Sequence, residues 1–248
     1  MNHFRGLTLF LLMWLAGSQS LYSQSYPDFV FSGGMGIIGK GVFQTDFGVS
    51  FARNELDTSG LANQLAPYIT LKYGLSDKSF IGLNYSFSQT NQFISDIVEK
   101  SNAVPSYTLS FTHQILKNWS VRTNLSLASN DISTANTSWQ TQLIAEHSFA
   151  EFFTWQNNLG VAWNFNSTQP TFNYLSGIVL GLPKPLDIIL EVYGNANNRQ
   201  SSYFTNLGLG IYFSKNFMSE IYAGFGQQNG NNQIFGSVNL FYRIVPVN

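Results

Sequence analysis

Residues able to carry catalysis are few in this chain. It has three histidines, His3, His113 and His147, and no cysteine in 248 residues. Ser148 follows His147 directly, but neighbouring residues of an extended strand point to opposite faces, so the two are not placed as a nucleophile and its base. No histidine pair has a metal-ligand spacing, and the carboxylates are scattered. We therefore expect no enzyme activity, no catalytic residues, no metal site and no cofactor.

The first 23 residues have the pattern of a secretory signal peptide. Arg5 precedes an apolar run over residues 7–16, and small or polar residues follow that run. The run is about ten residues long, whereas a membrane-spanning helix needs roughly twenty. We expect residues 1–23 to be removed by cleavage after Ser20 or Ser23, so that the mature protein is an exported one.

Apolar and polar residues alternate with a period of two along most of the mature chain, most clearly over residues 79–88 and 119–128. This period predicts β-strands with one apolar face. Aromatic residues make up 16% of the chain and charged residues only 10%, whereas a soluble domain carries roughly 25% charge. A barrel wall in lipid needs an apolar residue at every second position. Both observations predict an all-β fold, a transmembrane antiparallel up-and-down β-barrel.

The alternating segments predict about twelve strands. We expect them at residues 41–53, 65–73, 79–88, 105–114, 119–128, 138–148, 153–165, 171–182, 186–193, 203–213, 217–226 and 234–245. Long polar connections follow the odd-numbered strands and short connections follow the even-numbered ones. Short turns inside and long loops outside are typical of bacterial outer-membrane barrels, so both termini should be periplasmic.

Residues 24–40 precede the barrel, which we expect to span residues 41–248. This segment could be a periplasmic extension, a plug inside the lumen or an extra strand. We favour a short inward or periplasmic segment.

Seven charged residues of the expected strands fall on the inward parity. A lipid-facing charge near the bilayer midplane costs roughly 2–4 kcal/mol, so we expect these side chains to face inward. With a symmetric connection Asp46 would lie opposite Lys72, and Arg122 would lie diagonal to Glu146. The set either lines a pore or forms cross-strand pairs in a packed lumen. Its members are Asp46, Lys72, Arg122, Glu146, Glu191, Glu220 and Arg243.

Aromatic residues fall into two groups. Phe204, Tyr212 and Tyr222 have inward parity, where they either line an apolar path for a solute or pack the lumen. Others gather at the expected strand ends, the level at which amphipathic rings favour lipid headgroups. Those near the short turns are Trp119, Phe152, Phe153, Trp155, Phe213 and Phe217, and those towards the outer rim are Trp139, Trp163, Phe165, Phe172 and Tyr203.

Three stretches give the chain a resemblance to a known family. They are Tyr-Pro-Asp-Phe at 26–29 followed by Gly-Lys-Gly-Val-Phe-Gln at 39–44, Leu-Lys-Tyr-Gly-Leu-Ser-Asp-Lys at 71–78, and Leu-Glu-Val-Tyr-Gly at 190–194. With them the chain resembles the outer-membrane transporters grouped under the MetA pathway of phenol degradation. The resemblance implies a barrel of about twelve strands that carries small compounds, aromatic ones among them.

Two hypotheses about function follow. The first is a passive outer-membrane channel or transporter for small organic solutes, aromatic or hydrophobic ones among them. The second is a closed structural or surface-interaction barrel that acts through its extracellular loops. Barrels of about eight strands fill with side chains and those of sixteen or more leave channels, so twelve strands allow either. The expected partners are outer-membrane lipid and lipopolysaccharide, the barrel-assembly machinery and small organic solutes. The formal net charge of −1 argues against nucleic acid.

Overall fold

The structure is a computed structural model that describes residues 37–55, 61–94, 97–100, 104–128, 136–150, 152–165, 169–183, 185–197, 201–228 and 230–245. The expected signal peptide and most of segment 24–40 lie outside these residues and remain predictions. None of the described residues belongs to a helix that is long and apolar enough to cross a membrane.

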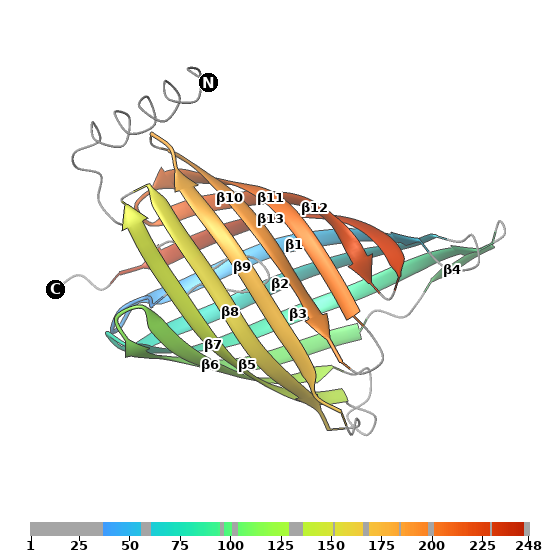
Figure 1. Cartoon of the computed structure of the whole chain (residues 1–248), viewed down its shortest axis with the longest axis horizontal. Helices are drawn as coiled ribbons and strands as arrows, with labels where there is room; N and C mark the ends of the chain where they lie inside the picture. Colours follow the sequence, from blue (N-terminus) through green and yellow to red (C-terminus); the bar gives the residue numbers. More distant parts are fainter. Residues whose placement is uncertain are drawn as a thin grey trace, which may run out of the picture.

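Twelve long strands form one closed antiparallel barrel (Figure 1). Each pairs with the long strands before and after it in the chain, and β1 pairs with β13 to complete the ring. The expected up-and-down barrel of about twelve strands is confirmed. The long strands are β1 (Phe43–Glu55), β2 (Leu61–Ser76), β3 (Ser79–Ile94), β5 (Val104–Leu116), β6 (Trp119–Ala128), β7 (Asn136–Ala150), β8 (Phe153–Asn164), β9 (Thr171–Gly181), β10 (Leu186–Ala196), β11 (Ser201–Ser214), β12 (Phe217–Gln228) and β13 (Asn231–Ile244).

A thirteenth strand, β4 (Ile97–Lys100), pairs with β3 alone. The sequence predicted a long polar connection over residues 89–104; instead, β3 continues to Ile94 and the chain returns as β4. Apolar alternation stops near Ser88, but the backbone ladder to β2 continues as far as Leu61 opposite Phe93. The strand β3 is therefore longer than its segment of alternating apolar residues. Alternation in the sequence predicts only that segment and not the whole strand.

The two ends of the barrel differ. We call the end that carries the short connections, where β1 begins and β13 ends, the turn end, and the opposite end the loop end (Figure 1). Register shifts accompany four of the turns, after Gly74, Gln114, Ser148 and Tyr212. Bulges at barrel rims bend a strand and increase its twist, which lets short connections close each hairpin.

The outer face is apolar, with exposed aromatic side chains at both ends of the strands. Leu207 in the middle of β11 is 54% exposed. Trp139 and Trp163 stack at the loop end with ring centroids 5.5 Å apart. Phe213 and Phe217 stack at the turn end at 5.1 Å. Such rings at two levels match the girdles that flank the lipid-facing band of membrane barrels.

Replacing Leu207 by arginine should destabilise the barrel in lipid by about 2–4 kcal/mol, because the charge would face the middle of the bilayer. Leu116→Arg at the turn end should cost only about 0–1 kcal/mol, since it lies near the interface. Reversible urea unfolding in lipid vesicles measures both. Equal costs at the two sites would contradict the assignment of the outer face.

Candidate functional site

The inner face of the barrel is polar and closely packed. The charged residues predicted from parity lie on this face: the side chains of Asp46, Lys72, Arg122, Glu191 and Glu220 are buried, and those of Glu146 and Arg243 are half-buried. Of the three aromatic candidates, Tyr222 is buried, and Phe204 and Tyr212 are half-buried. Burial on alternate residues in closed strands places these groups inside, and their role as pore-lining residues stays a prediction.

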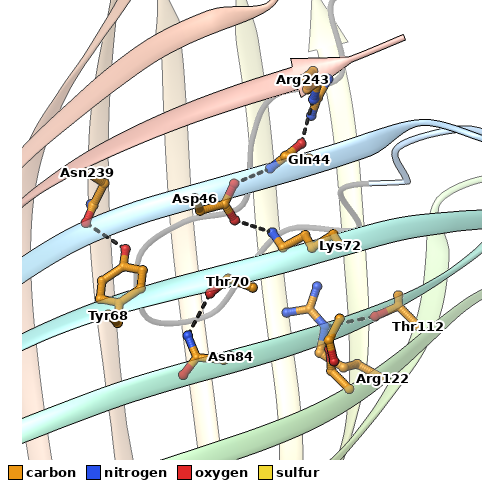
Figure 2. Close-up of polar contacts among 12 residues, drawn as sticks. Gln44, Asp46, Tyr68, Thr70, Lys72, Asn84, Thr112, Arg122, Asn239 and Arg243 are labelled. Atoms are coloured by element: carbon orange, nitrogen blue, oxygen red, sulfur yellow. Dashed lines mark hydrogen bonds and ion pairs between the residues drawn. The ribbon is translucent and has the colours of Figure 1, made fainter. Parts of the chain in front are cut away.

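A continuous polar network joins β13, β1 and β2 near the turn end (Figure 2). Arg243 Nε donates to Gln44 Oε1 at 2.6 Å, and Gln44 Nε2 donates to Asp46 Oδ1 at 2.7 Å. Asp46 Oδ2 also forms an ion pair with Lys72 Nζ at 3.0 Å. Because Gln44 presents both a donor and an acceptor, it connects Arg243 to the Asp46 carboxylate, which Lys72 contacts directly.

Two register predictions need correction. Asp46 lies opposite Thr70, and Gln44 lies opposite Lys72, so the ion pair is diagonal rather than directly across. The β1–β2 connection is displaced by two residues from the symmetric one that was assumed. Gln142 lies opposite Arg122, which places Glu146 four residues along β7 and beyond the diagonal position.

The lumen near the turn end holds an apolar cluster beside Arg122. Phe80 is 1% exposed and packs with Ile38 and Val42. The Arg122 guanidinium carbon lies 5.9 Å from the centre of the Phe80 ring, a cation–π distance, while Arg122 Nε donates to Thr112 Oγ1 at 3.0 Å (Figure 2). The described start of the chain thus fills part of this mouth.

Backbone contacts hold the start of the chain in place. Gly41 N donates to the Gly74 carbonyl at 2.8 Å, and Gly74 N donates to the Val42 carbonyl at 3.0 Å. Gly39 and Gly41 have φ of 84° and 75°, a region that other residues seldom occupy. A side chain at Gly74 would overlap the Gly39 carbonyl. Glycine at 74 therefore allows residues 37–42 to lie against β2.

Three carboxylates on β10 and β12, the strands on either side of β11, accept hydrogen bonds from neutral groups. Tyr212 donates to Asp187 at 2.7 Å, Asn206 to Glu191 at 2.8 Å and Tyr222 to Glu220 at 2.9 Å. The carboxylates belong to β10 and β12, whereas the basic residues belong to β2, β6 and β13. The charges of the inner face are therefore unevenly distributed around the barrel.

Four lumen-facing aromatic rings lie over glycines directly opposite them. In each pair a methyl group on the glycine would overlap the ring, so the glycine allows the ring to lie flat along the wall. The pairs are Tyr68 with Gly48, Tyr222 with Gly208, Phe235 with Gly224, and Phe204 with Gly226. Tyr68 crosses Gly48 and donates its hydroxyl to Asn239 Oδ1 on β13 at 2.6 Å (Figure 2).

A cavity of about 160 Å³ lies in the loop-end half of the lumen, between β7 and β11. Tyr193 and Phe204 stack beside it with centroids 5.2 Å apart, and Phe235 meets Phe204 edge-on at 5.7 Å. None of the described residues that line it is charged. Sequence reasoning missed Tyr68, Asp187, Tyr193 and Phe235. Their inward parity could be derived from the sequence, but the residues opposite them on neighbouring strands could not.

His113 and His147 lie at the turn end, on the outer face of the barrel. His113 Nδ1 and Ser79 Oγ are 2.8 Å apart, and the His113 ring stacks on Phe111 at 6.4 Å. Among the described residues no carboxylate contacts this ring, so the orienting third group of a serine–histidine catalytic unit is missing there. The described residues also contain no cluster of three or more potential metal-binding side chains.

No protein family and no curated protein matches this sequence. Solved structures share its fold. The COG4313 outer membrane channel from Pseudomonas putida F1 has 10% identity and a TM-score of 0.61, over 84% of this chain and 97% of that one. The β domain of the Bordetella autotransporter BrkA has 9% identity and a TM-score of 0.57, over 82% and 99%. The NanC porin has 7% identity and a TM-score of 0.54, over 80% and 100%. The chain therefore has the fold of an outer-membrane β-barrel.

Gly48→Ala should destabilise the protein by about 1–3 kcal/mol, because the added methyl group pushes Tyr68 off the wall. Gly210→Ala is the matched control: its methyl group would lie 3.4 Å from Asp187 Cβ, an ordinary contact, so its effect should stay within about 1 kcal/mol. Unfolding in detergent measures both. If Tyr68→Leu does not rescue Gly48→Ala, steric overlap with the ring is not the cause.

Lys72→Met should destabilise the protein by about 3–5 kcal/mol, since Asp46 would remain buried without its cation. Adding Asp46→Asn should restore most of that loss, because the amide needs no counter-charge. A double-mutant cycle of unfolding free energies measures the coupling. Additive effects would show that the 3.0 Å ion pair is not an energetic unit.

Proposed function

We propose that this protein is a channel of the bacterial outer membrane for small organic solutes, aromatic or hydrophobic ones among them, as in the family that its sequence resembles. The observation that carries the proposal is the inner face of the closed barrel, which carries charged groups and, around a cavity, amides and aromatic rings. The turn end would face the periplasm. Lipid, lipopolysaccharide and the barrel-assembly machinery would be its partners in the membrane.

The flat aromatic rings support a path for solutes. Phe204 and Phe235 each lie over a glycine. Phe235 is buried, whereas Phe204 is half-buried and lines the cavity, where a solute can contact its ring. A planar or apolar solute gains contact with such rings at little cost in side-chain order. A solute would thus contact the aromatic rings as it passes through the lumen.

The turn end supports a channel that is closed at rest. Ile38 and Val42 pack on Phe80 inside this mouth, and the backbone of residues 39–42 is bonded to Gly74. Segment 37–42 would therefore be part of the closure, and its removal would widen the path.

Single-channel conductance in a planar bilayer tests the proposal, comparing the mature protein with a deletion of residues 24–40. We expect small or intermittent conductance in the intact protein and a larger, steady one after the deletion. The current should favour cations, because the inner face of the described strands carries more carboxylates than basic groups: Asp46, Glu146, Asp187, Glu191 and Glu220 against Lys72, Arg122 and Arg243.

Silence of both proteins, with correct folding shown by heat-modifiable migration in gels, would contradict the channel. It would favour a closed barrel that acts through its outer loops. Glu191 and Glu220 are almost completely buried. This burial is the observation that favours the second function, because it is typical of a packed lumen.

A further inference from the structure

Half of the described residues that line the cavity between β7 and β11 carry uncharged amides. A side-chain amide both donates and accepts hydrogen bonds, as a hydroxyl group does. A charged ligand would find no counter-charge among the residues that line the cavity, and burying an unpaired charge is costly. The lining therefore suits a neutral molecule with several hydroxyl groups. The amides come from Gln140, Gln142, Asn158, Asn173 and Asn195.

One side of the cavity is aromatic. Tyr193 and Phe204 stack at 5.2 Å, and the edge-on contact of Phe235 holds Phe204 in this orientation. Gly226 opposite Phe204 keeps the ring close to the wall. A ligand with an apolar face and polar edges could place the face on this aromatic side and direct its edges to the amides.

Hydrogen-bonding capacity is left over beside the cavity. Asn173 Nδ2, on a lining residue, is buried without a hydrogen-bond partner. Gln156, two residues from the lining Asn158, is 0% exposed, and neither atom of its amide has a partner. A buried polar group without a partner is unfavourable, so a hydroxyl-bearing ligand would gain by supplying one.

The cavity has room for one ring and is partly open. A cavity of roughly 150 Å³ in another protein holds one benzene molecule, and this cavity measures about 160 Å³. We propose that it is a binding site for a single uncharged six-membered ring bearing several hydroxyl groups, as in a neutral hexose. This inference rests on the proposed channel only in its role: within the channel, the site would determine which solutes pass. Binding of the ligand to the site does not itself require conduction.

Titration of the full mature protein in detergent, followed by saturation-transfer NMR or calorimetry, tests the site with three probes. Glucose and catechol present hydroxyl groups on different rings, and glucuronate adds a charge to the sugar. We expect glucose, catechol or both to bind, and glucuronate to bind at least about tenfold more weakly than the better probe. Equal binding of glucose and glucuronate, or no binding of either neutral ring, would overturn the proposal.

Variants locate the binding. Asn173→Leu removes one amide and Phe204→Leu removes the ring, and each should weaken binding by about three- to tenfold. Asn84→Leu is the control, because Asn84 lies on β3 and contacts Thr70 away from the cavity. Affinity unchanged in both cavity variants, with heat-modifiable migration showing that they fold, would overturn the assignment. Binding in a protein without conductance would refute the channel alone, and conductance without binding would refute this site alone.

Discussion

Every structural feature of this chain depends on satisfying the backbone hydrogen bonds of its strands without an open edge. Lipid offers no partner for an N–H or C=O group, so a sheet crosses a membrane only when its first and last strands pair. Here β1 and β13 do so from Phe43 opposite Ile244 to Asn54 opposite Gln233. Closure then divides each strand into an outer set of side chains that meets lipid and an inner set that meets the lumen.

The inward-facing side chains must pack within a confined lumen, whereas the outward-facing side chains meet lipid. Twelve strands enclose a space too wide for uniform filling by small side chains and too narrow for a large pore. Glycines at positions 48, 208, 224 and 226 allow aromatic rings to lie along the wall. Polar groups bridge neighbouring strands, as Gln44 does between Arg243 and Asp46. An apolar cluster around Phe80 lies at the turn end, and a cavity lies in the loop-end half.

Alternation alone was enough to predict the barrel, its strand number and the inward parity of residues such as Asp46 and Glu191, because lipid penalises every exception on the outer face. It was not enough to predict strand length, since β3 continues past Ser88 on backbone pairing with no apolar signal. Alternation was also not enough to predict which residues lie opposite one another on neighbouring strands. Asp46 contacts Lys72 diagonally, because the register between β1 and β2 differs by two residues from that of a symmetric connection. A shift of two residues leaves both side chains on the inner face. Tyr193 and Phe235 could be recognised as part of the site only when the residues next to them on neighbouring strands were known.

The most direct test of the account is thiol accessibility, because the chain has no cysteine of its own. Phe204→Cys lies beside the lumen cavity and Leu207→Cys lies on the outer face of the same strand. In reconstituted vesicles we expect a small water-soluble maleimide to label position 204 and only a lipid-soluble reagent to label position 207. Protection of position 204 from the water-soluble reagent would mean a sealed lumen, and it would contradict the existence of a path for solutes through this barrel.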